Sequence, residues 1–191
     1  MPPLILASTS RYRRELLTRL RLPFEAVAPE VDETALPGET PAALAERLAL
    51  AKARAVAALR PGAIVIGSDQ VADLGGEAVG KPGTHEAAAA QLQRMSGREV
   101  VFQTAVAVVA PGLAAIERAE VRVRFRELSD ATIESYLRID QPYDCAGSAK
   151  VESLGIALLE AVESDDPTAL VGLPLIRTCA LLRRAGLEPL A

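Results

Sequence analysis

Residues 4–14 read LILASTSRYRR, and this stretch decides how the chain begins to fold. Four apolar residues followed at once by small hydroxyl residues are typical of a buried strand that ends in a loop. The apolar spacing of Leu16, Leu17 and Leu20 then predicts a helix over 10–20. Free backbone N–H groups and the positive end of the helix dipole should therefore face the loop.

Three arginines, Arg11, Arg13 and Arg14, fall in the first turn of this expected helix, where acidic residues are normally favoured. The placement is electrostatically unfavourable unless an anion binds there, which indicates a phosphate site. A helix simply capped by Ser10, with solvated arginines, explains the same residues. The motif by itself leaves both interpretations open.

The rest of the chain alternates expected strands with expected helices, and Gly75 and Gly76 mark a tight hairpin. This mixture of βα units and hairpins predicts an α/β fold on a mixed central sheet flanked by helices. The expected strands cover 3–7, 24–28, 63–67, 71–74, 77–79, 100–109 and 115–125, and the further helices cover 42–59, 84–95, 129–138 and 174–184.

Composition limits the classes of function. The net charge of −4 argues against a protein that binds nucleic acid polymers, because such proteins need a basic face. No apolar stretch is long enough to span a membrane, and nothing before the first strand resembles a signal peptide, so we expect a cytoplasmic protein. Cys145 and Cys179 have no metal-type spacing and are expected to be free thiols.

The residue content and the motifs of the chain exclude several catalytic classes. The single histidine, His85, rules out a histidine-rich zinc site and a pair of catalytic histidines. It is interpreted as a surface residue in the first turn of a helix. The chain also lacks a P-loop and a dinucleotide fingerprint.

A second chemical cluster follows the strand expected at 63–67. Asp69 should lie at the carboxyl end of this strand, where α/β folds gather their ligands, and its carboxylate could hold a divalent cation or orient a water. A capped turn explains the same aspartate. Lys81 lies between Gly80 and Pro82, which restrict the backbone. Such rigidity favours a lysine that binds phosphate, but a lysine in an ordinary turn explains the same residues.

Two further charged positions extend this cluster. Asp32 and Glu33 lie in an expected loop and add oxygen ligands suited to a hard metal ion. Lys52 lies among small residues of the expected helix 42–59, an unusual site for a lysine without a partner.

These residues occur in an order that resembles the Maf-like nucleotide pyrophosphatases over nearly the whole chain. The resemblance implies a single domain over 1–191 with two lobes and an active cleft between them, of the kind shared with inosine triphosphatases. It also implies metal-dependent hydrolysis of a nucleoside triphosphate to the monophosphate and pyrophosphate. The marks are 7–10 (ASTS), Arg13, Arg14, 31–33 (VDE), Lys52, 67–70 (GSDQ), 80–82 (GKP), 96–98 (SGR) and 171–175 (VGLPL).

The same resemblance assigns roles to individual residues. Asp69 would be the general base, and Glu33 and Asp69 would bind a divalent cation, Mg²⁺ or Mn²⁺. Arg11 departs from the pattern, because relatives usually have proline there. The residues expected around the triphosphate are Ser8, Arg13, Arg14, Lys52 and Lys81.

Three positions resemble the branch of the family that hydrolyses 7-methyl-GTP: Tyr12, Gln70 and Glu152. The chemistry is consistent with this, because methylation at ring nitrogen 7 makes guanine cationic. A tyrosine ring attracts a cation on its face, and a carboxylate can accept hydrogen bonds from guanine N–H groups while offsetting the charge. An exposed loop glutamate is the alternative interpretation of Glu152.

Two other functions stay open at this point. A pyrophosphatase of broader specificity could remove several modified nucleotides, and a nucleotide-binding regulator of cell division and septum formation could hydrolyse nucleotides only incidentally. The expected partner is a nucleoside triphosphate, with no nucleic acid polymer and no membrane. The sequence leaves the oligomeric state open, with a homodimer as one alternative.

Overall fold

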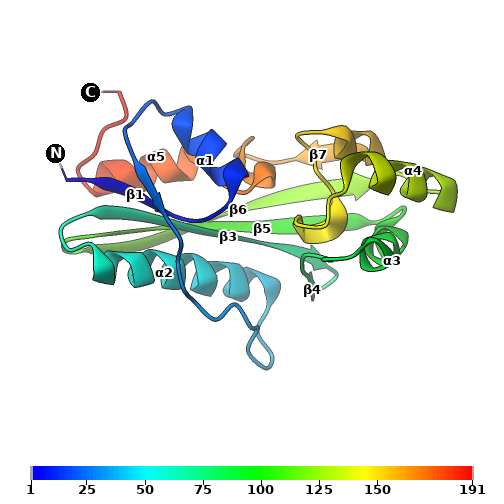
Figure 1. The fold of residues 1–191 in the computed structure, drawn as a ribbon, viewed down its shortest axis with the longest axis horizontal. Coiled ribbons are helices and arrows are strands. Elements are labelled where there is room, and N and C mark those ends of the chain that lie inside the picture. The colour runs from blue at the N-terminus through cyan, green and yellow to red at the C-terminus, as the bar shows by residue number, and fades with distance from the viewer. Residues whose placement is uncertain (1, 191) are drawn as a thin grey trace.

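The computed structural model describes residues 2–190, which form a seven-stranded mixed sheet with helices on both faces (Figure 1). The strand order is β2-β1-β3-β5-β6-β7, and β4 pairs with the far end of β3. The α/β fold with a mixed central sheet is confirmed. The strands are β1 (Leu4–Ala7), β2 (Glu25–Val27), β3 (Ile64–Leu74), β4 (Glu77–Val79), β5 (Glu99–Ala110), β6 (Leu113–Phe125) and β7 (Leu159–Glu163).

Four of the helices begin at a hydroxyl residue that caps them. The side chains of Ser10, Thr40, Thr84 and Ser129 each accept a hydrogen bond from the backbone N–H three residues later. Such caps satisfy N–H groups that have no partner within the helix. The helices are α1 (Arg11–Thr18), α2 (Pro41–Leu59), α3 (His85–Met95), α4 (Asp130–Asp140) and α5 (Leu175–Arg184), and short 3₁₀ helices cover Ala146–Ser148, Leu154–Leu158 and Ala169–Val171.

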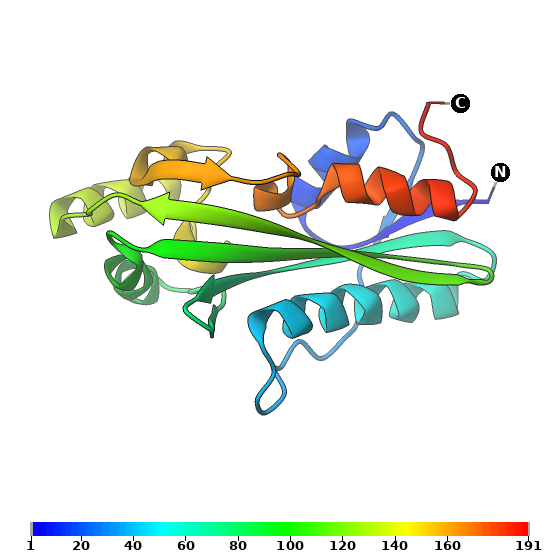
Figure 2. The ribbon, with the colours of Figure 1, turned by 180° about the vertical axis from the view of Figure 1, so that it is seen from behind.

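The sheet is continuous from one end of the molecule to the other, because β5 and β6 form a long hairpin that runs its full length (Figure 2). Alternation along β1 divides the core at one end: Leu4 and Leu6 pack toward α1 and α5, whereas Ile5 and Ala7 pack toward α2. At the other end, α3 and α4 cover the sheet through a separate apolar cluster that includes Leu92, Met95 and Leu137.

The longest departure from the expected elements concerns β3. A strand was expected over 63–67 and another over 71–74, but the structure has one strand of 11 residues, Ile64–Leu74. Antiparallel pairing with β5, from Val65 opposite Val109 to Asp73 opposite Val101, carries the strand through the polar residues between the two apolar runs. Asp69 therefore lies inside a strand, and the expectation that it follows the end of one was wrong.

The other edge of β3 is paired in two separate pieces. Residues 64–67 pair with the parallel strand β1, and residues 72–74 pair with the antiparallel strand β4. Within residues 2–190, no strand pairs with 68–71 on this edge. This interruption separates two groups of elements and opens the sheet beside Asp69.

Strand β7 was not expected from the sequence. It forms the edge of the sheet beyond β6, with a register shift at Arg124 and Phe125. The segment LEAVE is too short and too acidic to be predicted as a strand from the sequence.

None of the helices within residues 2–190 combines the length and the apolar character needed to span a membrane.

Candidate active site

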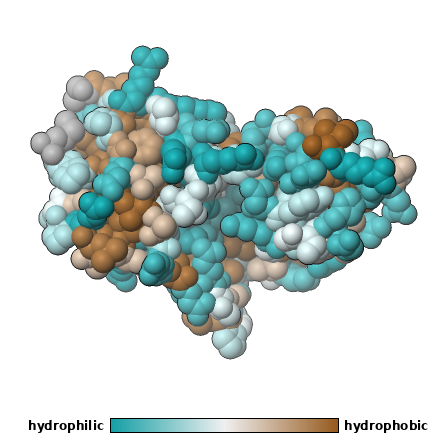
Figure 3. All heavy atoms as spheres, viewed as in Figure 1, coloured by the Kyte–Doolittle hydropathy of each residue, from teal (hydrophilic) through white to brown (hydrophobic). Residues whose placement is uncertain are grey.

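A cavity of about 450 Å³ opens at the interruption in the sheet. Figure 3 shows the corresponding hollow between two masses of the molecule, with hydrophilic residues around it. Residues from the loop after β1, the start of α1, α2, β3 and the segments 144–152 and 170–172 form its walls. Of the residues predicted for the site, the cavity is lined by Ser8, Tyr12, Arg13, Glu33, Lys52, Gln70, Lys81 and Glu152.

Asp69 and Arg14 are the two predicted residues that do not line this cavity within residues 2–190. Asp69 is buried next to it and contacts the lining residue Lys52. Arg14 is exposed on the first turns of α1. The three residues before it, Arg11, Tyr12 and Arg13, do line the cavity. The placement favours Arg13 as the arginine that meets a ligand.

Arg13 is held by the backbone on the opposite side of the site. Its Nε donates to the carbonyl oxygen of Gly172 at 2.9 Å, which leaves the terminal nitrogens for an anion. Desolvation lowers the pKa of Arg13, and the charges of Asp69 and Glu33 act in the opposite direction. Because an arginine side chain is not deprotonated in proteins, the guanidinium is a permanent positive charge in the site.

The loop after β1 presents hydrogen-bonding groups beside Arg13. Ser8 is buried, and its Oγ accepts a hydrogen bond from the backbone N–H of Ser10 at 3.1 Å. Ser10 in turn caps α1 by accepting from the N–H of Arg13 at 3.4 Å. The capping role of Ser10 and an anion site are therefore compatible, because different N–H groups and side chains serve each.

Lys52 joins the two predicted acidic residues. Its Nζ lies 2.6 Å from Oε1 of Glu33 and 2.6 Å from Oδ1 of Asp69, and it is buried. The lysine that looked unpartnered in the sequence therefore has two carboxylate partners. Burial acts to raise the pKa of Glu33, but the hydrogen bond to Lys52 and the charges of Lys52, Lys81 and Arg13 together lower it overall.

The same two carboxylates are the donors that were predicted to bind a metal ion. The structure groups no three or more His, Cys, Asp or Glu residues suited to a metal within residues 2–190. Mg²⁺, however, is commonly held by one or two carboxylates with water and substrate phosphates completing the shell. Two carboxylates that already share one ammonium nitrogen fit that kind of site.

Gln70 is held in one orientation by the protein. Its Nε2 lies 3.0 Å from each of three acceptors, Thr104 Oγ1 and the backbone oxygens of Ala169 and Leu170. The two carbonyl oxygens can only accept, which fixes the amide nitrogen on their side. The Gln70 carbonyl oxygen is therefore the atom left to meet a ligand, and it can accept from an N–H group.

The far end of the cavity combines an aromatic ring with acidic groups. Tyr12, Asp144, Cys145 and Glu152 line it, and partial desolvation raises the pKa of the Glu152 carboxyl. Desolvation also raises the pKa of Cys145 to about 12, so the thiol stays protonated and unreactive near neutral pH. A cationic ring would offset the acidic charge at this end.

The backbone around Glu152 is tied down by its neighbours. Nζ of Lys150 donates to the carbonyl oxygen of Asp140 at 2.8 Å, at the end of α4, and Oγ of Ser153 donates to Oδ1 of the same aspartate at 2.6 Å. A Cβ built on Gly155 would lie 2.5 Å from the carbonyl oxygen of Lys150. The close approach at Gly155 fixes the turn that carries Glu152.

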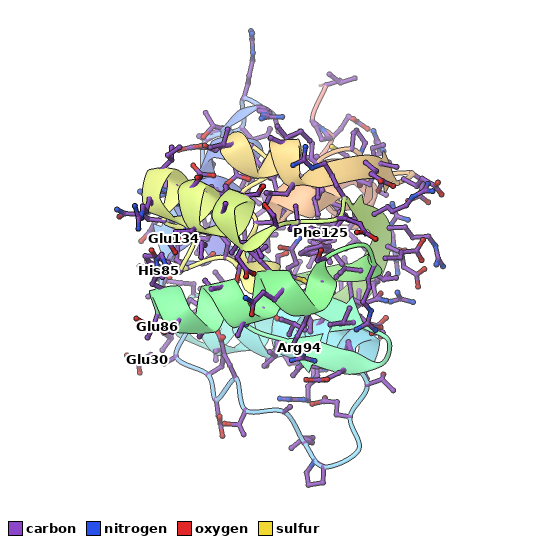
Figure 4. All side chains as sticks on the ribbon, turned by 90° about the vertical axis from the view of Figure 1, so that its right-hand side faces the viewer. Glu30, His85, Glu86, Arg94, Phe125 and Glu134 are labelled. Atoms are coloured by element: carbon purple, nitrogen blue, oxygen red, sulfur yellow. The ribbon has the colours of Figure 1, made fainter. Side chains whose placement is uncertain are left out.

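His85 of α3 connects the segment before Asp144 with helix α4. Its Nε2 lies 2.8 Å from Oε2 of Glu134 in α4, and its Nδ1 lies 3.0 Å from the hydroxyl of Tyr143. Figure 4 shows His85 at the start of α3, with Glu134 on α4 next to it. The interpretation as a surface residue was incomplete, because the ring also holds the segment that precedes Asp144.

Sequence reasoning missed two contributors to the site. Asp144 lines the cavity but follows Pro142 and Tyr143 in a stretch that looks like an ordinary turn. Gly172 serves through its carbonyl oxygen, which accepts from Arg13 and from Oγ of Ser68 at 3.0 Å. A backbone acceptor leaves no chemical signature in a sequence. Asp144, in contrast, could have been predicted as a site residue because it lies only eight residues before Glu152.

The fold and the site together define an α/β protein whose cleft is lined by Arg13, Lys52 and Lys81 and also by an aromatic ring with acidic residues. The Maf-like protein family matches residues 3–185, and the chain belongs to this family. This finding confirms the resemblance drawn from the ordered motifs.

Similar proteins match the chain over nearly its whole length. The 7-methyl-GTP pyrophosphatase of Polaromonas sp. strain JS666 is 69% identical over 186 residues, which cover 96% of this chain and 85% of that protein. The 7-methyl-GTP pyrophosphatase of Albidiferax ferrireducens is 65% identical, with 98% and 95% covered. A HAM1 protein from Coxiella burnetii has a similar fold, with a TM-score of 0.51, 14% identity and coverage of 97% and 100%.

Proposed function

We propose that this protein hydrolyses 7-methyl-GTP to 7-methyl-GMP and pyrophosphate in the cytoplasm and so removes a modified nucleotide. The observation that carries the proposal is the polarity of the cavity. The charges of Lys52, Lys81 and Arg13 act together on Glu33, whereas the charges of Asp144 and Glu152 act on Cys145, which lines the cavity with Tyr12. A nucleotide with a polyphosphate tail and a cationic base has the same division of charge. Relatives at 65–69% identity that carry the name 7-methyl-GTP pyrophosphatase support it.

The proposed reaction is attack of a water oxygen on the α-phosphorus. A bond forms between that oxygen and phosphorus, and the bond from phosphorus to the α,β-bridging oxygen breaks. The bridging oxygen leaves as part of pyrophosphate, and Asp69 accepts the proton of the water. Arg13 and Lys81 stabilise the charge that develops on the leaving pyrophosphate.

Glu33 and Asp69 would hold a divalent cation in this proposal. Such an ion supplies charge neutralisation for the phosphate oxygens and makes bound water more acidic, which matters because an aspartate is a weak base at neutral pH. Nζ of Lys52, which contacts both carboxylates, is placed to turn from them toward the phosphate oxygens. We therefore propose Lys52 as a ligand of the triphosphate in the loaded site.

The experiment that tests the function is a measurement of pyrophosphate release from 7-methyl-GTP, GTP, dTTP, UTP and CTP. We expect the highest kcat/KM with 7-methyl-GTP. Equal activity on all five would favour a house-cleaning enzyme of broad specificity. Absence of release from every substrate would contradict the proposal and favour a nucleotide-binding regulator.

Removal of divalent cations tests the proposed metal. We expect treatment with EDTA to abolish pyrophosphate release, and Mg²⁺ or Mn²⁺ added in excess of the chelator to restore it, because Glu33 and Asp69 need the ion to activate water. Activity that persists unchanged in EDTA would contradict the metal-dependent mechanism while leaving the substrate assignment intact.

Replacing Glu152 by Gln tests the recognition of the base. Glutamine keeps the size and one acceptor but loses the negative charge that offsets the cationic ring. We expect the ratio of kcat/KM for 7-methyl-GTP over GTP to fall at least about tenfold, because hydrogen bonds to charged groups are worth roughly 1.5–3 kcal/mol. Glu160→Gln, which changes the same charge on the exposed strand β7, is the control and should leave the ratio unchanged. A ratio unaffected by Glu152→Gln would remove this residue from base recognition.

A further inference from the structure

Arg11 and Tyr12 form a pair at the acidic end of the cavity. Nη2 of Arg11 donates to the Tyr12 hydroxyl at 2.7 Å, and Cζ of Arg11 lies 4.7 Å from the centroid of the Tyr12 ring. This distance is within the range of a cation–π contact. Among residues 2–190, the Tyr12 hydroxyl is the only group that accepts a hydrogen bond from the Arg11 side chain.

The partner that Tyr12 has in this structure is chemically similar to the base it is proposed to bind. A guanidinium is a planar, delocalised cation with N–H groups along its edge. The ring system of 7-methylguanine is also planar, positively charged and edged with N–H groups. Both Arg11 and Tyr12 line the cavity, so the guanidinium is already placed where a cationic ring would compete with it.

The acidic groups near Arg11 also attract its guanidinium, as they would attract a cationic base. The hydrogen bond to Tyr12 is the leading cause that raises the pKa of Arg11, and the charge of Asp144 acts in the same direction. The charge of Arg11 in turn acts on the carboxyl of Glu152 and lowers its pKa against the larger effect of desolvation. Arg11 therefore supplies part of the positive charge that balances the acidic end of the cavity.

We propose that Arg11 is a specificity-determining residue, which occupies Tyr12 in the free protein and weakens discrimination in favour of a cationic base. The inference rests on the proposed function, because it requires the base to approach Tyr12. A methylated base has to displace the guanidinium and also meets its charge. An unmethylated guanine displaces the same group but carries no charge to be repelled, so the cost falls selectively on the cationic ligand.

The test compares the affinities of 7-methyl-GMP and GMP, measured by calorimetry, so that no hydrolysis intervenes. For Arg11→Gln we expect the ratio of the two affinities to rise about two- to fivefold in favour of the methylated nucleotide, the size of an interaction between two exposed charges. Arg11→Lys keeps the charge without the planar group and should give a smaller rise. Arg19→Gln is the control, because it removes one charge from the exposed end of the same helix and should leave the ratio unchanged.

The outcomes separate the inference from the function on which it rests. Normal binding with an unchanged or lower ratio in Arg11→Gln would overturn the inference alone. An equal rise in Arg19→Gln would also overturn it, because the effect would then come from net charge. Failure of the unsubstituted protein to bind either monophosphate, together with failure to release pyrophosphate from 7-methyl-GTP, would overturn both.

Discussion

Replacing Asp69 by Asn will reduce pyrophosphate release by at least about a hundredfold, the lower end of what a general base contributes. The amide keeps the shape of the carboxylate and an oxygen that can accept from Nζ of Lys52, which lies 2.6 Å from Asp69 Oδ1 in the native protein. It cannot accept a proton from water. Because the cavity is lined by other residues, we expect nucleotide affinity, measured in EDTA so that no cation contributes, to stay within about threefold of the native value.

Asp73→Asn is a matched control for this substitution. Asp73 lies on the same strand, four residues further along, and its Oδ1 accepts from the N–H of Gly76 at 2.6 Å in the hairpin that follows. Asparagine also accepts in such turns, so stability and turnover should change little. Comparable rates for Asp69→Asn and Asp73→Asn would show that a group other than Asp69 accepts the proton.

Replacing Gly67 by Ala will destabilise the protein by about 3 kcal/mol or more, at the upper end of the usual cost of overpacking a core. A Cβ at Gly67 would lie 2.2 Å from the carbonyl oxygen of Ala49 and 2.6 Å from the backbone nitrogen of Ala53. Both atoms belong to the backbone of α2, so the whole helix must move away from β3. We expect the melting temperature to fall by roughly 6–12 °C.

The displacement caused by Gly67→Ala should also reach the site. Lys52 comes from α2 and Asp69 from β3, so a change in the spacing of these elements alters the ion pair between them. Gly80→Ala is the control, because a Cβ there would meet no atom within 4 Å. A native melting temperature for Gly67→Ala would show that α2 and β3 have more freedom than their packing indicates.

Those parts of the fold with strong local patterns were predictable from the sequence. The helix α2 was expected over 42–59 and covers Pro41–Leu59, because an alanine-rich stretch has few alternatives to a helix. The hairpin at Gly75 and Gly76 was predicted for a similar reason, since glycine readily adopts the positive φ found at both.

The features that could not be predicted from the sequence depend on partners that are distant along the chain. Ser68, Asp69 and Gln70 belong to β3 because β5 pairs with all three, and a polar run carries no local signal for that. The partners of Lys52 were also hidden, because Glu33 and Asp69 lie 19 and 17 residues away along the chain. The site residues themselves could be named from the motifs, but their pairing and orientation required the fold.

The interrupted pairing along β3 divides the site into a fixed part and an adaptable part. Asp69 is paired with Ala105 in the middle of the sheet, and amides in such positions open only when much of the domain unfolds. The walls that would hold the phosphates and the base come instead from loops, which open locally at far lower free energy. Conformational adjustment to different nucleotides therefore belongs to the loops of the cavity walls rather than to β3, while the carboxylate of Asp69 remains a stationary reference against which each bound ligand is aligned.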